Sequence, residues 1–392
     1  MGERSSGHRK QLSNASREPL NAYDPRQSYR WNFEQAPPYL DRPKSCSGVQ
    51  GDESNIEGIP SVIAEDAKDA MNSSHASWDF LGLPTMSPFG IAAGPLLNGA
   101  WCLHYAELGF DVVTYKTVRS VARECYEMPN LVPVACSKMT GNERSVNISE
   151  EMLGTWAVSF GMPSSSPEEW RRDVEATRNA LDDRKCLAVS VVGTQQDGWG
   201  LQELASDYAQ CAKWAVQSGA DVIEANFSCP NVSTCDGQLY QDAYMSRLVA
   251  SVIREAVGNV PLVIKIGFVP DPNQVQELVA NLEGLVDGLS MTNSLASRVI
   301  TQQGEKLFLG EQRGICGEAI RDPSLQQVSA FQRVIERVGS QIKLIGVGGI
   351  SAPEHVQAYL DAGASFCHLA TAIMTDPEIG LRLAQVEYRR TK

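Results

Sequence analysis

Short apolar segments alternate with longer amphipathic segments over most of the chain, from residue 77 onward. Eight of the apolar segments are rich in β-branched residues, which predicts short strands buried on both faces. We expect these strands at 90–93, 111–116, 187–192, 221–226, 262–266, 287–291, 343–346 and 366–369. Ahead of the first strand, residues 78–88 predict a short hairpin.

The segments between the strands show helical periodicity. Within 201–217, apolar residues such as Leu201, Leu204 and Tyr208 recur at steps of three and four, and Gly219 follows where a helix usually ends. Eight strands alternating with helices predict an α/β fold, a (β/α)₈ TIM barrel. A doubly wound open sheet is the alternative, because the count of eight depends on short segments.

Two connections are too long for a simple helical crossover, one after Lys116 and one after Asn293. Both follow the carboxyl end of a predicted strand, so we expect both insertions on the catalytic face of the barrel. Residues Thr117–Pro167 are predicted to form a cover over the site, with a contact between subunits as the alternative.

The first 76 residues are predicted to be an N-terminal extension of the barrel domain, which spans 77–392. The first 50 residues are rich in Ser, Arg, Asn and Pro and show little periodicity. This composition cannot bury much apolar surface, and we expect at least the first 20 residues to be disordered.

Composition narrows the class of protein. The chain has 392 residues, of which 43% are hydrophobic, and a formal net charge of −13. Nucleic acid is a poor partner for such an acidic chain, because phosphate contacts need Lys and Arg. No apolar run approaches the roughly 20 residues that span a bilayer, and no secretory signal pattern is present. We therefore expect a cytoplasmic protein without membrane or nucleic-acid partners.

The ten cysteines are scattered and form no C-x-x-C pair. Zinc and iron–sulfur sites need closely grouped ligands, so no metal site is predicted. Free thiols in a reducing compartment are the expected state.

Polar side chains gather where predicted strands end. The fourth strand runs into N-F-S-C-P-N at 226–231, which includes Asn226, Cys229 and Asn231, and Asn293 follows the sixth strand. Asparagine offers both a donor and an acceptor, which suits a small cyclic imide or amide substrate. For any single asparagine, a role in a turn is the alternative.

Two lysines add positive charge at the predicted site, and a glycine turn allows a ligand to approach the backbone closely. Lys116 and Lys265 lie at strand ends, where a buried ammonium is costly unless it faces an anion. Gly348 and Gly349 follow the seventh strand, at the place where barrels often seat a phosphate. These features predict a phosphorylated cofactor or substrate.

The order and spacing of these motifs resemble the dihydroorotate dehydrogenase family over roughly residues 77–377, and N-F-S-C-P-N is the most specific motif. The supporting motifs are S-P-F-G-I-A-A-G at 87–94, V-T-Y-K-T at 113–117, F-G-M-P-S at 160–164, V-I-K-I at 263–266, T-N-S at 292–294, G-I-C-G-E-A-I at 314–320, G-V-G-G-I at 346–350 and A-T-A at 370–372.

This resemblance implies an FMN-dependent oxidoreductase that acts on a CH–CH bond, oxidising dihydroorotate to orotate in pyrimidine biosynthesis. It implies that Cys229 is the general base, that hydride passes to FMN, and that Lys116 and Lys265 are catalytic lysines beside the flavin. The implied cofactor-binding residues are Ala92, Ala93, Gly94, Lys116, Thr117, Lys265, Gly317, Gly348, Gly349, Ala370 and Thr371. The implied substrate-binding residues are Asn226, Asn231, Asn293, Ser294 and Asn147.

The branch of the family is also indicated. The membrane-associated class has a serine base and an apolar pair of N-terminal helices, whereas this chain has Cys229 and no such pair. The chain therefore resembles the soluble, cysteine-base class, with fumarate or another soluble electron acceptor. A homodimer is the expected assembly.

One position departs from the family pattern. The family usually has a substrate-binding Asn three residues before Gly161, and this chain has Val158 there. Either Asn147 or Ser159 compensates, or the enzyme is a related FMN oxidoreductase that acts on another substrate in specialised metabolism. A catalytically silent barrel that serves as a scaffold is a third hypothesis, which the presence of Cys229 together with both lysines disfavours.

Overall fold

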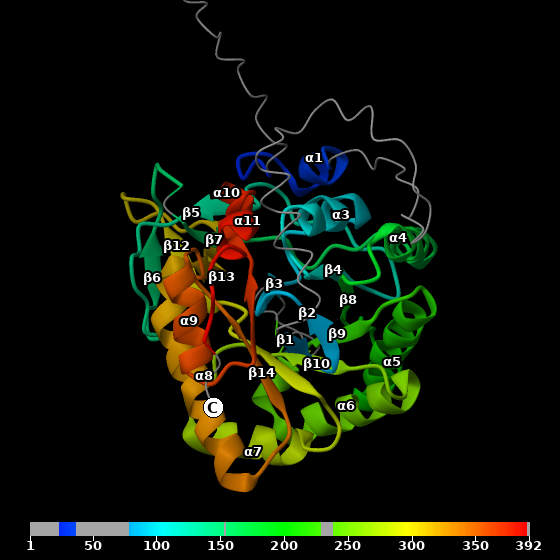
Figure 1. Cartoon of the computed structure of the whole chain (residues 1–392). Helices are drawn as coiled ribbons and strands as arrows, with labels where there is room; N and C mark the ends of the chain where they lie inside the picture. Colours follow the sequence, from blue (N-terminus) through cyan, green and yellow to red (C-terminus); the bar gives the residue numbers. More distant parts are fainter. Residues whose placement is uncertain (1–22, 37–77, 153, 229–237, 390–392) are drawn as a thin grey trace, which may run out of the picture.

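The computed structural model describes residues 23–36, 78–152, 154–228 and 238–389, and its centre is a closed parallel barrel (Figure 1). The barrel strands are β3 Phe89–Ile91, β4 Val112–Val118, β8 Cys186–Val191, β9 Val222–Asn226, β10 Leu262–Lys265, β11 Gly288–Met291, β14 Lys343–Val347 and β15 Phe366–Leu369. The predicted barrel and its eight strands are confirmed, with ends shifted by one or two residues.

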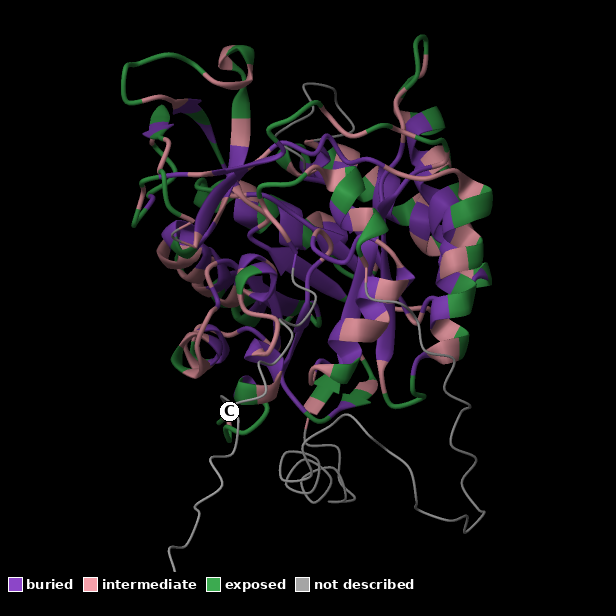
Figure 2. Ribbon diagram, turned by 90° about the horizontal axis from the view of Figure 1, so that it is seen from above, coloured by how far each residue is buried: buried purple, intermediate pink, exposed green. Residues whose placement is uncertain are grey.

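Helices surround the barrel and follow its strands in the predicted alternation. They are α3 Gly99–Glu107, α4 Pro167–Ala180, α5 Leu201–Gln217, α6 Ala243–Val257, α7 Pro272–Leu282, α8 Arg321–Val338, α9 Pro353–Asp361, α10 Thr371–Thr375 and α11 Ile379–Leu383, with α1 Tyr29–Glu34 near the N-terminus. Helix α5 has the predicted bounds, and Gly219 follows it with φ +97°. Figure 2 shows buried barrel strands and helices with one buried and one exposed face.

The amino-terminal end of the barrel is closed by the predicted hairpin, formed by β1 Trp78–Phe80 and β2 Leu83–Thr85. The Phe80 ring lies 4.6 Å from the Phe366 ring and 5.6 Å from the His368 ring, between centroids. Apolar side chains at the starts of several barrel strands belong to the same cluster. The hairpin is therefore a plug that excludes water from this end of the barrel.

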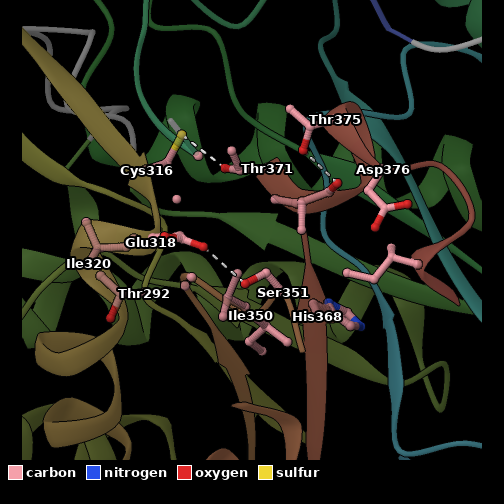
Figure 3. Close-up of a pocket in the computed structure, with 18 of the residues that line it drawn as sticks. Thr292, Cys316, Glu318, Ile320, Ile350, Ser351, His368, Thr371, Thr375 and Asp376 are labelled. Carbon is pink, nitrogen blue, oxygen red and sulfur yellow. Dashed lines mark hydrogen bonds between the residues drawn. The ribbon is translucent and has the colours of Figure 1, made fainter. Parts of the chain in front are cut away.

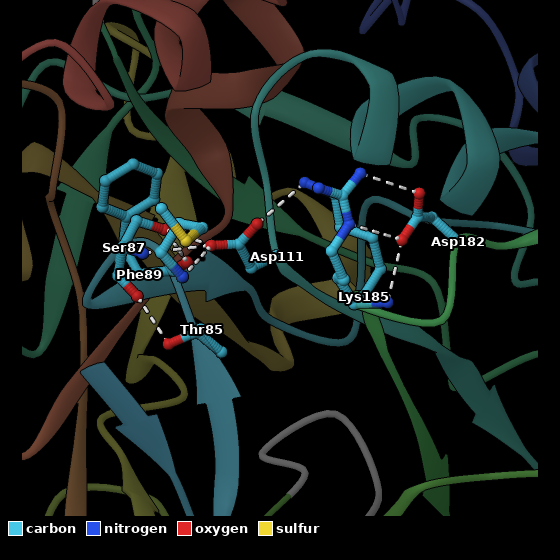
Figure 4. Close-up of polar contacts among 8 residues, drawn as sticks. Thr85, Ser87, Phe89, Asp111, Asp182 and Lys185 are labelled. Carbon is cyan, nitrogen blue, oxygen red and sulfur yellow. Dashed lines mark hydrogen bonds and ion pairs between the residues drawn. The ribbon is translucent and has the colours of Figure 1, made fainter. Parts of the chain in front are cut away.

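A buried carboxylate holds the plug to the barrel. Asp111 accepts hydrogen bonds from the backbone N–H groups of Met86 and Ser87, at 2.8 and 3.0 Å, and from the Ser87 hydroxyl. Its second oxygen lies 2.8 Å from Lys185 Nζ (Figure 4). The residue just before β4 thus joins the hairpin to the start of β8.

The two insertions form a single second sheet. Its strands are β5 Leu131–Pro133, β6 Ser145–Asn147, β7 Thr155–Val158, β12 Leu295–Ile300 and β13 Gln312–Gly317, in the order β5-β7-β13-β12-β6. Three strands come from the insertion after Lys116, and two come from the insertion after Asn293. The sequence predicted two separate insertions, whereas the structure pairs them through β7 and β13.

Three short 3₁₀ turns complete the described elements, at Leu239–Gln241, Phe308–Gly310 and Glu318–Ile320. In the described part of the chain, no helix combines the length and apolar character needed to cross a membrane. The expected disorder of the first 20 residues falls outside the described residues.

Candidate active site

A cavity of about 300 Å³ opens at the carboxyl ends of β14 and β15 (Figure 3). Five predicted cofactor-binding residues line it, together with the predicted substrate-binding Asn293. The five are Gly317, Gly348, Gly349, Ala370 and Thr371. The barrel thus brings these six predicted residues together although Asn293 and Thr371 are 78 positions apart in the sequence.

The glycine turn after β14 forms one wall of the cavity. Gly348 has φ +131°, and a Cβ there would lie 2.5 Å from Ser324 Oγ. Gly349 has φ +65°, and a Cβ there would lie 2.7 Å from Arg321 Cβ. Both the backbone conformation and the lack of space therefore require glycine. The absence of side chains leaves the peptide groups of this turn close to the cavity.

One cation lies beside the glycine turn, and two carboxylates line the cavity. Arg321 lies beside the turn, and its Nη1 donates to Gly349 O at 3.0 Å. Two carboxylates also line the cavity, and both have partners: Asp376 pairs with Arg382, and Glu318 accepts from Ser351 Oγ at 3.3 Å. A phosphate is favoured at the glycine turn, where peptide N–H groups and a cation offset its charge.

The inner part of the cavity holds two buried polar side chains that sequence reasoning missed. Thr292 is fully buried and His368 is 2% exposed. Within the described residues, Thr292 Oγ1 and both ring nitrogens of His368 have no hydrogen-bond partner. Because buried polar atoms are usually satisfied, these atoms indicate a polar ligand or water in the cavity. The signal in the sequence was a histidine inside an otherwise apolar strand.

The environment keeps His368 neutral. Burial lowers the pKa of His368 to about 4, with Glu224 opposing and Lys265 reinforcing this shift. At neutral pH the imidazole therefore has one N–H donor and one acceptor nitrogen. It offers a hydrogen-bonding group at the cavity floor without adding charge.

Lys265 forms an ion pair inside the barrel. Its Nζ lies 2.8 Å from Glu224 Oε1, and the side chains are 4% and 3% exposed. Both residues occupy inward positions, since Asn226 pairs with Lys265 and Glu224 lies two residues earlier on β9. Sequence reasoning identified Lys265 but missed Glu224. The pair places a positive group at the strand end and holds its charge compensated.

The other residues predicted beside the flavin lie at neighbouring strand ends. Lys116 is buried in β4, and Thr117 Oγ1 lies 2.9 Å from Ser190 Oγ. Ala92, Ala93 and Gly94 directly follow β3. Among the described residues, these five and Lys265 do not line the cavity. The structure therefore groups the residues predicted to hold the phosphate of FMN in one cavity. The residues predicted to contact the flavin ring lie outside the lining of that cavity.

Two predicted substrate-binding asparagines converge on one residue. Asn226 Oδ1 accepts from the backbone N–H of Ser228 at 3.1 Å, and Asn293 Nδ2 donates to Ser228 O at 2.8 Å. Ser294 is half-buried next to Asn293, at the beginning of the second insertion. Cys229 and Asn231 follow Ser228 but lie outside the described residues, so their predicted roles stay predictions.

The position that departs from the family pattern lies on β7. Val158 is half-buried and pairs with Gly314 of β13. The neighbouring Ser159 is buried and its hydroxyl accepts a 2.9 Å bond from Arg313 Nε. The other proposed substitute, Asn147, is exposed on the edge strand β6. The missing amide at Val158 is therefore not replaced at the same place in the described structure.

A second thiol lies in the cavity wall. Burial raises the pKa of Cys316 to about 11, and the Thr371 hydroxyl, which donates to its sulfur at 3.5 Å, opposes that shift. The thiol therefore stays protonated near neutral pH. This protonation makes Cys316 a poor base.

Comparison with known proteins is consistent with this arrangement. The family model described as dihydroorotate dehydrogenase matches residues 76–385. The chain belongs to the dihydroorotate dehydrogenase family. This match covers the whole barrel and both insertions, and it makes the chain an oxidoreductase of the dihydroorotate dehydrogenase type.

Relatives in the family carry different names. A dihydroorotate dehydrogenase from Dictyostelium discoideum is 31% identical over 344 residues, which are 83% of this chain and 91% of the relative. A dihydroorotate dehydrogenase (quinone) from Idiomarina loihiensis is 25% identical and covers 75% of this chain and 81% of the relative. A dihydroorotate dehydrogenase B (NAD(+)) catalytic subunit from Oceanobacillus iheyensis is 31% identical over 40% of this chain and 50% of the relative.

A solved structure supports the fold. It is titled as the crystal structure of DHODH from Eimeria tenella in complex with ferulenol. It matches with a TM-score of 0.64 at 18% identity, covering 83% of this chain and 88% of that one. At this identity the match supports the barrel architecture alone.

Proposed function

We propose that the protein oxidises dihydroorotate to orotate in pyrimidine biosynthesis, using FMN and a cysteine base. The observation that carries this proposal is the arrangement of the strand ends: buried Lys116 and Lys265, with Asn226 and Asn293, lie at one end of the barrel beside the glycine-walled cavity. The Dictyostelium discoideum relative, matched over 91% of its length, supports the substrate.

The proposed cofactor contacts follow the cavity. Gly348, Gly349 and Thr371, with Gly317 and Ala370 beside them, would hold the phosphate end of FMN. The ring end would lie along Ala92, Ala93, Gly94 and Thr117. When bound, FMN supplies the hydride acceptor for the oxidation.

The two lysines supply positive charge where negative charge develops. Lys265 is held in place by Glu224 at 2.8 Å, in surroundings that exclude water. A fixed cation in such a site stabilises a developing anion more than it would in water. We propose the same task for Lys116, which is buried at the end of β4.

The amides orient the substrate ring. Asn226, Asn231 and Asn293, with Ser294, would pair with the amide and carbonyl groups of a cyclic imide. Two of them, Asn226 and Asn293, bond to the same Ser228, and that shared contact fixes their relative positions. Asn147 is the remaining proposed substrate contact and is exposed in the structure described.

Cys229 is proposed as the base that removes the proton from the substrate carbon. Its assignment comes from the N-F-S-C-P-N motif, and on that basis we propose that the chain is of the soluble, cysteine-base class. A thiol has an ordinary pKa of about 8.5, close enough to neutrality for this task. Cys316, whose pKa is raised to about 11, is the less suitable thiol.

The position of Val158 favours a second candidate function, in which a related FMN oxidoreductase acts on a different substrate in specialised metabolism. A site that hydrogen-bonds a substrate loses about 1–3 kcal/mol when one polar group is left without a partner. Ser159 Oγ accepts from Arg313 Nε and keeps its O–H as a donor, so this hydroxyl replaces only part of the missing amide, which carries two N–H donors and a carbonyl acceptor.

The electron acceptor and the assembly are part of the proposal. The named relatives include quinone and NAD(+) enzymes. We propose a soluble acceptor such as fumarate, and a cytoplasmic homodimer.

The experiment that tests the function is anaerobic mixing of the yellow holoprotein with dihydroorotate, followed by flavin absorbance. Rapid bleaching is expected, and colour should return on adding fumarate but not a quinone or NAD(+). Cys229→Ala is expected to keep its flavin and lose most of the bleaching. A holoprotein that does not bleach would favour the second candidate, and normal bleaching in Cys229→Ala would remove this cysteine from the base role.

A further inference from the structure

An N-terminal segment packs against the barrel beside Lys116. Residues 23–36, which include helix α1, lie next to α3 (Figure 1). Trp101 Nε1 of α3 donates to Asn32 O at 3.1 Å, and Asn98 Nδ2 donates to Phe33 O at 3.0 Å. These contacts join positions 65 and 69 residues apart in the chain, so the segment is docked by tertiary contacts.

The segment is also ordered by its own contacts. Asn32 is fully buried, and its Nδ2 donates to Asp24 O and Ser28 O at 2.9 and 3.0 Å. Its Oδ1 accepts from the backbone N–H of Asp24 at 2.8 Å. A single side chain thus closes the loop before α1, and the ring of Tyr23 packs on Trp101 at 6.4 Å.

Tyr29 is the residue that this segment directs at the site. Its backbone N–H donates to Asn130 Oδ1 at 2.9 Å, and its ring meets the Phe160 ring edge-on at 5.5 Å. The ammonium of Lys116 lies over the Tyr29 ring, 5.9 Å from its centroid. The aromatic face therefore adjoins a lysine that the proposed function uses, at a distance within the range of cation–π contacts.

The phenol and thiol groups around this contact are neutral. Burial raises the pKa of Tyr29, and nearby Cys125 raises it further. Burial likewise raises the pKa of Cys125 to about 11, with Lys116 opposing. Tyr23 also has a raised pKa, mainly from burial. At neutral pH the Tyr29 ring acts on Lys116 through its π face, because the phenol is not ionised.

We propose that Tyr29 is a positioning residue for Lys116, and that residues 23–36 complete the active site. The ring holds the ammonium at the barrel mouth and shields it from water, so that the cation is ready when the ligand binds. The inference rests on the proposed role of Lys116. It assigns a part of the predicted N-terminal extension to the site itself.

The test uses the full-length holoprotein and compares Tyr29→Leu with Tyr29→Phe. The rate of flavin reduction by dihydroorotate is expected to fall about five- to twentyfold in Tyr29→Leu, as for the loss of a partly desolvated cation–π contact. Tyr29→Phe keeps the π face and is expected to stay within about twofold of the wild type on the same physical basis. Trp31→Leu, on an exposed position of the same helix, is the matched control.

A double-mutant cycle separates positioning from a general structural effect. Lys116→Met is expected to slow flavin reduction, and Tyr29→Leu is expected to add little in the Lys116→Met background because the two side chains act together. Fully additive losses would overturn the proposal. Tyr29→Met replaces Tyr29→Leu if the melting temperature or the flavin content of the latter falls below that of Trp31→Leu.

A measurement without substrate distinguishes this inference from the proposed function. Brief labelling of the flavin-free protein with an amine-acylating reagent, located by mass spectrometry, should leave Lys116 protected in the wild type, Tyr29→Phe and Trp31→Leu. Tyr29→Leu should expose it. Equal protection of Lys116 in all four proteins would overturn the positioning role of Tyr29 and leave the proposed function unaffected. Normal flavin reduction in Lys116→Met would instead remove the proposed role of Lys116 and the positioning task with it.

Discussion

Single residues inside the barrel carry polar chemistry that an apolar strand pattern hides. Glu224, Lys265 and His368 are buried at inward positions. Burying a charged group is costly. Removing either Glu224 or Lys265 would leave the other charge buried without its partner and lower the free energy of unfolding by about 3–5 kcal/mol. Groups with pKa values shifted by burial cluster at functional sites, which makes His368 a candidate for a role in the site. The neutral His368 lines the cavity floor, whereas the ion pair between Lys265 and Glu224 lies outside the cavity lining.

His368 makes stability depend on pH. Its pKa is lowered from 6.5 to about 4 in the folded protein. As pH falls through 6.5, His368 is protonated in the unfolded chain, whereas in the folded chain it is protonated only near pH 4. The free energy of unfolding should therefore decrease as pH falls through this window, by ~3 kcal/mol at most from this group.

The measurement is urea unfolding between pH 4 and 7, comparing the wild type with His368→Gln. The variant has no imidazole to protonate, so its free energy of unfolding should decline less over this window. An identical decline in both proteins would assign the acid sensitivity to other groups.

Val158 tests the proposed substrate at the residue scale. We expect Val158→Asn to tighten dihydroorotate binding about five- to tenfold, because the new amide would satisfy a group otherwise left unpaired. The measurement is the dissociation constant from flavin absorbance under anaerobic titration. Val158→Thr, which keeps the shape but not the amide, is the control. Weaker binding in Val158→Asn would mean that Val158 does not face the substrate.

At the scale of elements, the turn after β14 and the paired insertions shape the cavity. The turn needs two consecutive glycines with positive φ, 131° and 65°, because neighbouring side chains leave no room for a Cβ. The strand β13 ends at Gly317 in the cavity wall, so the second insertion reaches the site as well. Each element supplies backbone rather than long side chains to this wall.

Gly349→Ala tests the glycine turn. The added Cβ would lie 2.7 Å from Arg321 Cβ, so the turn must shift. Overpacking of this kind costs about 1–3 kcal/mol, and we expect FMN affinity to fall by about tenfold or more, measured by fluorescence titration of the flavin-free protein. Gly339→Ala is the matched control, since Gly339 has φ +69° with no atom within 4 Å of its added Cβ. Equal FMN affinities would contradict the proposed phosphate seat.

At the scale of the whole molecule, the barrel is closed at one end by the hairpin, and the inserted segments contribute to the cavity wall at the other end. Asp111 connects the plug to two barrel strands through the backbone of Met86 and Ser87 and through Lys185. The opposite end carries the cavity, with the second sheet and the N-terminal segment beside it. The contacts of Asp111 thus lie at the opposite end of the barrel from the proposed chemistry.

This separation predicts how Asp111→Ala behaves. Removal of the carboxylate leaves buried N–H groups and the Lys185 ammonium without a partner, at a cost of about 3–5 kcal/mol in the free energy of unfolding. Flavin binding at 25 °C should change little. Asp182→Ala, which loses an exposed pair with Arg184, should cost less than about 1 kcal/mol. Comparable denaturant midpoints for the two variants would contradict the role of Asp111.

Local pattern predicted the eight strands, and the structure closes them into the expected barrel instead of the open sheet that was the alternative. Strand positions follow from runs of apolar, β-branched residues, and α5 follows from three- and four-residue spacing that Gly219 ends. The candidate residues at the strand ends follow as well, because parallel strands of one barrel bring their carboxyl ends to the same face. Lys265 and Gly348 were therefore predictable from their positions after strands.

By itself, the amino-acid sequence determined the barrel, its catalytic face and the set of strand-end residues, since each depends on the local order of apolar and polar positions. Tertiary structure alone decided that β7 pairs with β13, that Glu224 faces Lys265, and that Tyr29 lies under the Lys116 ammonium. These contacts join residues 41 to 162 positions apart, and no local periodicity records such a partner. Only tertiary packing, in the barrel, in the second sheet and at the N-terminal segment, brings them together.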